Sequence, residues 1–166
     1  SKYFDNPSSK LNLIGVTGTN GKTTIDTLLY DLYTELEIKS GLISTVKISY
    51  DNKNFQANQT TPDSLSINRF LSEMVNSNVR YCFMEVSSHG IDQNRTDGLI
   101  FKGGIFTNLT HDHLDYHESF ENYRDTKKRF FDSLCNNSFA LTNNDDKNGM
   151  IMLQNTIADK YTNSLN

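Results

Sequence analysis

Short apolar runs alternate with helical periods along this chain. Runs at 11–16, 81–87, 104–109 and 138–142 have the length and composition of buried strands. Between them, apolar residues recur three and four positions apart, which is typical of helices that pack one face on a sheet. This alternation predicts crossover units on a largely parallel sheet flanked by helices, so the expected fold class is α/β.

Three helices are predicted from these periods. The first begins near Lys22, and its core-facing stripe is Ile25, Leu28, Leu29, Leu32, Tyr33 and Leu36. The second opens at Thr61, a cap followed by Pro62 at the first helical position, and its stripe is Ile67, Phe70, Leu71, Met74 and Val75. The third runs from Phe120 to Leu134 behind Ser119, a residue type that caps helices.

Two other segments have weaker patterns. The β-like run 41–50, the polar turn 51–54 and the short run 55–57 together suggest a strand with a return strand, as in a hairpin. The residues after 142 are expected to form a helical tail.

The composition indicates one folded domain over residues 1–166. Apolar residues make up 36% of the chain, and 16 Lys and Arg against 20 Asp and Glu give a net charge of −4. This net charge is too small to indicate a disordered chain. Its negative sign argues against nucleic acid or an anionic membrane as the main partner. No apolar run approaches the roughly 18–20 residues of a membrane span, and the start lacks a signal-peptide core, so the cytoplasm is the expected compartment. Cys82 and Cys135 lack metal-site spacing and are expected to be packing residues.

The segment GVTGTNGKTT at 15–24 lies between a predicted strand and a predicted helix, where a nucleotide phosphate loop belongs. Its glycines allow successive N–H groups to point at one anion, and the helix N-terminus adds a partial positive charge. Lys22 would reach the outer phosphates, and Thr23 a magnesium ion. Val16 stands where the usual pattern begins with glycine, but the core of the motif favours ATP or GTP.

Glu85 interrupts a run that otherwise looks like a strand buried on both faces. A lone buried carboxylate is costly, whereas one at the carboxyl end of a parallel strand faces the crevice where such sheets bind ligands. Magnesium is a natural partner, because it prefers oxygen ligands and shares them with phosphates. A salt bridge at the strand end is the simpler alternative.

Lys127 is a second misplaced charge. With each residue advanced by about 100°, it falls at the centre of the apolar stripe of the third helix, whereas Lys128 falls off the stripe and is expected to be solvated. An inward lysine loses hydration unless it is paired or chemically altered. The alternative is that its ammonium extends to the edge of the stripe.

Residues 111–117 hold three of the four histidines. A zinc hydrolase pattern would begin with His111, His113 and Asp115, but Tyr116 occupies the place of its next histidine. His111 and His117 are otherwise expected to be surface residues without a ligand role.

Five ordered motifs closely resemble the ATP-dependent Mur ligases of peptidoglycan synthesis, especially the MurE type. They are LIGVTGTNGKTT, QTTPD at 59–63, MEVSSHGIDQNR at 84–95, FTNLTHDHLDYH at 106–117 and YRDTK at 123–127. The resemblance implies a phosphate-binding loop of Gly18, Thr19, Asn20, Gly21, Lys22, Thr23 and Thr24. It further implies a first magnesium ion at Thr23, a magnesium-binding glutamate at Glu85, and a second ion at His113 and Lys127, with Lys127 carbamylated by CO2.

The resemblance also implies a substrate and a reaction. Residues matching those that hold a UDP-muramoyl dipeptide are Gln59, Thr60, Thr61, Ser87, Gln93 and Arg95, although some members have asparagine at the position of Gln59. ATP would phosphorylate the γ-carboxylate of UDP-MurNAc-L-Ala-D-Glu, and the amine of an amino acid would attack the acyl phosphate. Lys22, Glu85, His113 and Lys127 would carry this catalysis.

Members of this family have further amino-terminal and carboxy-terminal domains that bind the uridine nucleotide and the amino acid. Neither is recognisable here, so this chain alone is expected to bind ATP with magnesium weakly and not to ligate, and its sequence leaves the added amino acid and the oligomeric state open. Two alternatives remain: a related amide ligase of the folylpolyglutamate synthase or cyanophycin synthetase type, and a non-catalytic nucleotide-binding module.

Overall fold

The computed structural model describes residues 1–112 and 114–165, and strands in these ranges form one sheet in the order β4-β3-β2-β5-β1-β6-β7-β8. The strands are β1 Asn12–Thr17, β2 Ser40–Ile43, β3 Lys47–Tyr50, β4 Lys53–Gln56, β5 Tyr81–Glu85, β6 Gly103–Phe106, β7 Phe139–Asn143 and β8 Asp159–Asn163. From β2 to β8 along the sheet every pairing is parallel, and β3 and β4 add an antiparallel edge. The predicted α/β class is confirmed.

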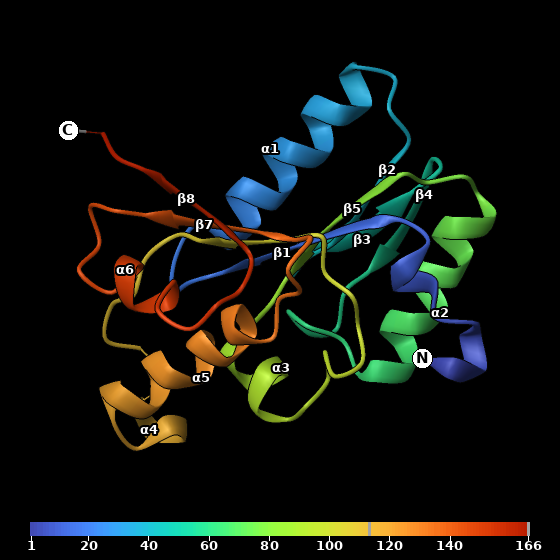
Figure 1. Ribbon diagram of the computed structural model, residues 1–166. Coiled ribbons are helices and arrows are strands. Elements are labelled where there is room, and N and C mark those ends of the chain that lie inside the picture. Colours follow the sequence, from blue (N-terminus) through green and yellow to red (C-terminus); the bar gives the residue numbers. More distant parts are fainter. Residues whose placement is uncertain (113, 166) are drawn as a thin grey trace.

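Helices cover the two faces of the sheet unequally. They are α1 Lys22–Glu35, α2 Ser64–Asn76, α3 Ser88–Asp92, α4 Leu114–His117, α5 Phe120–Asp132 and α6 Gly149–Met152. In Figure 1, α1 lies above the sheet, whereas α2, α3, α5 and α6 lie below it. None of the described helices combines the length and the apolar composition needed to cross a bilayer.

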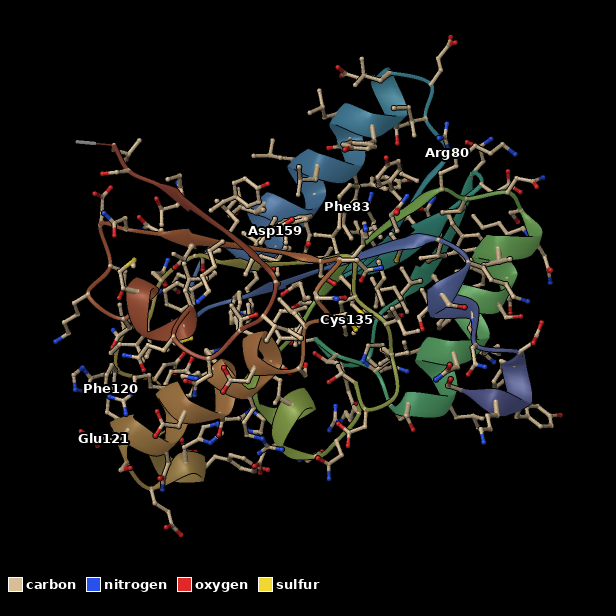
Figure 2. All side chains as sticks on the ribbon, viewed as in Figure 1. Arg80, Phe83, Phe120, Glu121, Cys135 and Asp159 are labelled. Atoms are coloured by element: carbon tan, nitrogen blue, oxygen red, sulfur yellow. The ribbon has the colours of Figure 1, made fainter. Side chains whose placement is uncertain are left out.

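The core follows this layering. The larger apolar cluster lies below the sheet and includes Leu13, Leu71, Met84 and Phe131, all fully buried. The smaller cluster lies under α1 around Phe83, as Figure 2 shows, and α1 contributes Leu29 and Tyr33 to it. Both faces of β5 are therefore apolar, as the uninterrupted run at 81–84 predicted.

The predicted stripe of α1 is wrong in part. Leu28, Leu32 and Leu36 are 63%, 50% and 59% exposed, while Leu29 and Tyr33 pack on the sheet. A helix that contacts only one sheet buries a narrow seam, and the periodicity alone does not show how wide that seam is. The residue of α1 that is buried is Asp26, an acid.

Leu32→Ala is expected to lower the free energy of unfolding by less than about 1 kcal/mol, because half of the side chain already contacts solvent. Chemical denaturation of the chain measures this. Leu29→Ala is the matched control on the same helix, and it should cause the larger loss because Leu29 packs on the cluster around Phe83. Equal losses for the two variants would contradict the assignment of the buried seam.

Three local expectations need correction. The run 41–50 is two antiparallel strands, β2 and β3, and the return strand is β4, which follows a turn in which Asp51 and Asn52 have positive φ. The cap of α2 is Asp63, not Thr61, because the Asp63 carboxylate accepts the N–H of Ser66 at 2.9 Å. The predicted helical tail contains only one short helix, α6, and then forms the strand β8.

Other local expectations hold or fail individually. Ser119 caps α5 as predicted and accepts the N–H of Asn122 at 3.1 Å. Cys82 is buried as expected, but Cys135, which follows the end of α5, is exposed and is not the packing residue that was expected.

Candidate functional site

The loop 18–21 joins β1, in the middle of the sheet, to the start of α1. Gly18 is required at its position, because a Cβ there would lie 1.9 Å from Thr107 Oγ1. The loop after β6 fixes its backbone: Thr19 N–H donates to Asn108 O at 2.9 Å, and Thr107 Oγ1 donates to Asn20 O at 2.7 Å. The phosphate loop predicted from sequence is therefore held in shape by residues about 90 positions away.

The N-terminus of α1 has no side-chain cap. Its N-cap residue is Gly21, whereas Asp63, Ser87 and Ser119 each cap their helices through a side chain. The first N–H groups of a helix have no intrahelical acceptor and carry a partial positive charge. The start of α1 is thus suited to receive an anion from outside the chain.

Lys22 lies at this N-terminus and folds back over the loop. Its Nζ donates to Gly18 O at 3.0 Å and to Thr19 O at 2.9 Å. Burial lowers the pKa of Lys22, and the nearby carboxylate of Glu85 opposes this shift. An anionic group in the loop would offer this ammonium a charged partner in place of two carbonyls.

Glu85 ends β5, the strand next to β1, and is 1% exposed. Its Oε1 accepts Thr23 Oγ1–H at 2.8 Å and the N–H of Thr45 at 2.7 Å, and its Oε2 accepts Thr45 Oγ1–H at 3.0 Å. The prediction that this carboxylate stands at the carboxyl end of a parallel strand beside the phosphate loop is confirmed.

Thr45 is a site residue that the sequence reasoning missed. It follows β2, which pairs with β5 in parallel, so the ends of both strands meet at one edge of the sheet. The signal was its position just after a strand, but the undivided run 41–50 concealed where that strand ends.

Lys127 points inward from α5, as predicted, and is 1% exposed. Its Nζ donates to Gly18 O at 3.0 Å and lies 4.8 Å from the ring centroid of Tyr123. Burial lowers its pKa well below the usual range, and the neighbouring ammonium of Lys22 lowers it further. Two lysines thus share one carbonyl, an arrangement that disfavours two positive charges.

Lys128 is not the solvated residue that its place on the helix predicted. It is 8% exposed, and its ammonium donates to both carboxylate oxygens of Asp132 at 2.7 Å. The next turn of α5 supplies this partner at spacing i, i+4.

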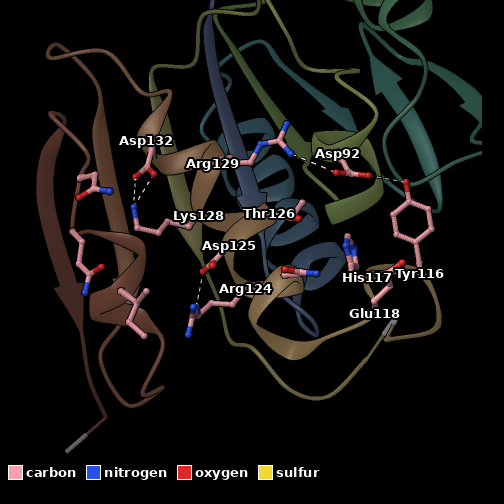
Figure 3. Close-up of a pocket in the computed structure, with 14 residues that line it drawn as sticks. Asp92, Tyr116, His117, Glu118, Arg124, Asp125, Thr126, Lys128, Arg129 and Asp132 are labelled. Carbon is pink, nitrogen blue, oxygen red and sulfur yellow. Dashed lines mark hydrogen bonds and ion pairs between the residues drawn. The ribbon is translucent and has the colours of Figure 1, made fainter.

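A groove of about 750 Å³ runs along α5, separate from this site (Figure 3). Its ion pairs are Lys128–Asp132, Arg129–Asp92 and Arg124–Asp125. Because each of these cations already has an acidic partner, the groove has little surplus charge for an ionic ligand. None of the predicted site residues lines it.

The residues predicted to hold a dipeptide lie together beside Glu85. Arg95 connects them: its Nη1 donates to Gln59 Oε1 and to Thr61 O, each at 2.7 Å, and its Nε donates to Gln93 Oε1 at 3.1 Å. Thr60 Oγ1 lies 3.1 Å from Thr45 Oγ1. The structure brings these positions to one place, and their role toward a substrate stays a prediction.

Thr61 has a structural task at this edge. It is fully buried, and its Oγ1 donates to Glu85 O at 2.9 Å and accepts the N–H of Ser87 at 2.9 Å. The hydroxyl of Ser87 lies 3.0 Å from that of Thr61 and also caps α3. These two hydroxyls fix the backbone directly after Glu85.

The histidine loop is described in part. His113 lies outside the described residues, so its predicted metal role is not placed. His111 stacks on Phe120 at the surface, whereas His117 is buried against Tyr123, which corrects its expected exposure. Within 1–112 and 114–165, no group of three His, Cys, Asp or Glu side chains could hold a metal by itself.

Asp26 is a further residue that the sequence reasoning missed. It is fully buried under α1, and among the described residues neither of its carboxylate oxygens has a hydrogen-bond partner. Burial raises its pKa well above the usual range, and the charge of Glu85 raises it further. The charge of Lys22 acts in the opposite direction and lowers this pKa.

Two curated proteins that this chain matches carry the same name. The chain is 57% identical over 165 residues to the UDP-N-acetylmuramoyl-L-alanyl-D-glutamate–2,6-diaminopimelate ligase of Cytophaga hutchinsonii, covering 99% of this chain and 34% of the relative. The ligase of the same name from Bacteroides fragilis is 57% identical over 163 residues, covering 98% and 34%. The chain thus spans about a third of the length of these curated relatives.

Solved structures show the same fold. A structure of a UDP-N-acetylmuramoyl-L-alanyl-D-glutamate–2,6-diaminopimelate ligase matches with a TM-score of 0.83 and 30% identity, covering 93% of this chain and 32% of that one. A Mycobacterium tuberculosis folylpolyglutamate synthase complexed with ADP and AMPPCP matches with a TM-score of 0.74 at 15% identity, covering 97% and 45%, which shows the fold alone. The model of the Mur ligase middle domain matches residues 16–166. This match covers most of the chain, and the glycine-rich loop, the glutamate at the end of β5 and the inward lysine of α5 all lie within it. The chain therefore belongs to the Mur ligase middle domain family.

Proposed function

We propose that this chain is the ATP-binding domain of a ligase that joins an amino acid to UDP-MurNAc-L-Ala-D-Glu in peptidoglycan synthesis. One observation carries the proposal: Lys22 and Lys127 converge on the carbonyl of Gly18, while Glu85 accepts the hydroxyl of Thr23 beside them. Phosphoryl transfer is catalysed by positioning and by electrostatic stabilisation, and these residues offer a phosphate loop, an acid and an inward lysine at one point for both tasks.

The residues present fit ATP and magnesium. The uncapped N-terminus of α1 and the ammonium of Lys22 would hold the phosphates. Thr23 and Glu85 supply the hydroxyl and carboxylate oxygens that Mg²⁺ prefers, and they already contact each other at 2.8 Å. Bound magnesium would offset the repulsion between two anions, which amounts to several kcal/mol at about 4 Å in an effective dielectric of about 20.

A carbamate on Lys127 completes this proposal, with His113 as its partner at a second magnesium ion. The burial of Lys127 and the nearness of Lys22 favour a neutral amine, the form that attacks CO2. The nitrogen forms a bond to the carbon of CO2, one C=O electron pair moves to oxygen and the nitrogen releases a proton, which leaves an anionic carbamate in place of the neutral amine. The change of sign would explain why α5 carries a lysine at the centre of its buried side.

The acceptor would lie at the edge formed by Gln59, Thr60, Thr61, Ser87, Gln93 and Arg95. Its γ-carboxylate would attack the γ-phosphorus of ATP, releasing ADP and forming an acyl phosphate. The amine of the amino acid would then attack the acyl carbon, release phosphate and form the amide. The names of the relatives give 2,6-diaminopimelate as this amino acid, and we extend it to this protein within the proposal.

Further domains of a longer protein, in the cytoplasm, would hold the uridine nucleotide and the amino acid. The decisive experiment measures phosphate release by that full-length protein with ATP, Mg²⁺, UDP-MurNAc-L-Ala-D-Glu and 2,6-diaminopimelate. Release that requires both substrates is expected. Release with a folate and glutamate instead would favour the folylpolyglutamate synthase type, and turnover by the 166-residue chain alone would refute the need for further domains.

Lys22→Ala is expected to weaken ATP binding to this chain about tenfold or more, because one charge-assisted contact with the phosphates is lost. Titration calorimetry with Mg²⁺ and ATP measures the change. Lys47→Ala is a matched control, since this half-buried lysine lies over the ring of Tyr30, outside the phosphate loop, and it should leave binding unchanged. Equal binding by wild type and Lys22→Ala would remove the phosphate loop from the proposal.

A further inference from the structure

We propose that Thr45 is a positioning residue that aims the carboxylate of Glu85 at the metal of the phosphate loop, an inference that rests on the proposed function. Two of the three hydrogen bonds described for the Glu85 carboxylate come from Thr45, one from its N–H and one from its hydroxyl. Each contacts a different carboxylate oxygen, so together they fix the plane of the group and not only its distance.

The turn after β2 prepares Thr45 for this contact. Ser44 is fully buried, and its hydroxyl donates to Lys47 O at 3.0 Å while accepting the N–H groups of Val46 and Lys47 at 3.3 and 3.2 Å. These bonds close the tight connection from β2 to β3. The N–H of Thr45 is left outside this network and points at Glu85 Oε1, 2.7 Å away.

The hydrogen bonds of Thr45 matter because Glu85 has little else to orient it. A glutamate side chain has three rotatable bonds, and the third described donor, Thr23 Oγ1, belongs to a residue that the proposed metal would itself engage. When a cation takes oxygens of Thr23 and Glu85, the Thr45 bonds are the ones that can persist. Groups that hold a metal ligand in place commonly change metal affinity by about tenfold or more.

Thr45 also connects the metal carboxylate to the predicted acceptor site. Its Oγ1 is placed to donate to Glu85 Oε2 at 3.0 Å and to Thr60 Oγ1 at 3.1 Å. A hydroxyl has a single proton, so it can donate to only one of them at a time. The carboxylate is the stronger acceptor, which favours donation to Glu85 over donation to Thr60.

The test compares metal-dependent and metal-free nucleotide binding by the 166-residue chain. The variants are Thr45→Val, which removes the hydroxyl and keeps the shape, Thr45→Ala, and Thr45→Ser, which restores the hydroxyl. Thr34→Val is the matched control, because it removes a hydroxyl that donates to Tyr30 O on α1. Dissociation constants are measured up to millimolar nucleotide for ATP with Mg²⁺, for ATP in excess chelator, and for ATP with Mn²⁺ followed by water-proton relaxation.

We expect Thr45→Val and Thr45→Ala to weaken Mg²⁺-ATP and Mn²⁺-ATP binding about five- to tenfold, with metal-free ATP unchanged. Thr45→Ser and Thr34→Val should bind like wild type. Unchanged metal-dependent binding in Thr45→Val, or an equal loss with and without metal, would overturn the positioning role. If the wild-type chain binds no ATP under any of these conditions, the proposed function itself fails, and the two failures are therefore distinguishable.

Discussion

Replacing Lys127 by alanine is expected to lower the ligase activity of the full-length protein by about a thousandfold or more. The variant loses a group that lies 3.0 Å from Gly18 O, inside the phosphate loop, and with it the proposed carbamate. Loss of an electrostatic group aimed at the reacting phosphate commonly costs two to three orders of magnitude, and loss of a metal ligand adds to that. Substrate-dependent phosphate release at saturating ATP measures the effect.

Lys128→Ala is the control for this experiment, because it removes a lysine from the adjacent position of the same helix. The ammonium of Lys128 pairs with Asp132. The ligase activity of Lys128→Ala should therefore stay within about threefold of wild type. Lys127→Arg should be as inactive as alanine, since a guanidinium keeps the positive charge and does not form a carbamate. Full activity in Lys127→Arg would show that the carbamate is not needed.

The intact mass of the full-length protein, measured with ATP, Mg²⁺ and bicarbonate present, tests the modification directly. A mass increase of one CO2 that disappears in Lys127→Ala and persists in Lys128→Ala is expected. A chain with an active phosphate loop and no such increase would assign Lys127 a purely structural contact with Gly18.

Asp26→Asn is expected to stabilise this chain by about 2–4 kcal/mol at pH 7–8, because it removes a buried carboxyl group that has no described hydrogen-bond partner. Asparagine has nearly the same shape, so the cavity and the packing of α1 on the sheet are kept. Urea denaturation of both proteins measures the difference in the free energy of unfolding.

The gain should depend on pH in one direction. Burial, and then the charge of Glu85, raises the pKa of folded Asp26 well above its unfolded value of 3.8. The folded state therefore holds this proton more tightly, so this stabilisation is complete below pH 3.8 and is lost as the pH rises through the folded pKa. Asp26→Asn should differ little from wild type near pH 3.8 and gain most above neutrality.

Asp31→Asn supplies the comparison on the same helix, since Asp31 is exposed, and a change below about 0.5 kcal/mol is expected at every pH. A pH-independent difference between Asp26→Asn and wild type would show that the carboxyl group of Asp26 has the same pKa in the folded and unfolded states. Lower stability of Asp26→Asn at pH 8 would mean that the acid has a partner in solution that asparagine does not replace.

Most of the candidate site could be predicted from local sequence motifs. The strand at 11–16, the glycine-rich turn and Lys22 at the start of a helix follow one another directly in the sequence, and Glu85 is recognisable as an acid in an apolar run. Lys127 could be predicted to point inward because helical periodicity shows which side of a helix each residue occupies. Lys128 was misjudged because its partner, Asp132, turns a position beside the stripe into a buried ion pair.

By itself, the sequence determined the α/β alternation, the phosphate loop and the two unusual charges, because each depends on neighbours along the chain. Only the tertiary structure decided that Gly18 O receives both lysines, one of them 109 positions away, and that Thr45 reaches Glu85 across 40 residues. These contacts follow from the strand order, which brings the ends of β1, β2 and β5 to one edge of the sheet. Because α1 lies alone on its face of the sheet, Leu32 stays half exposed, and the buried residue of this helix is Asp26.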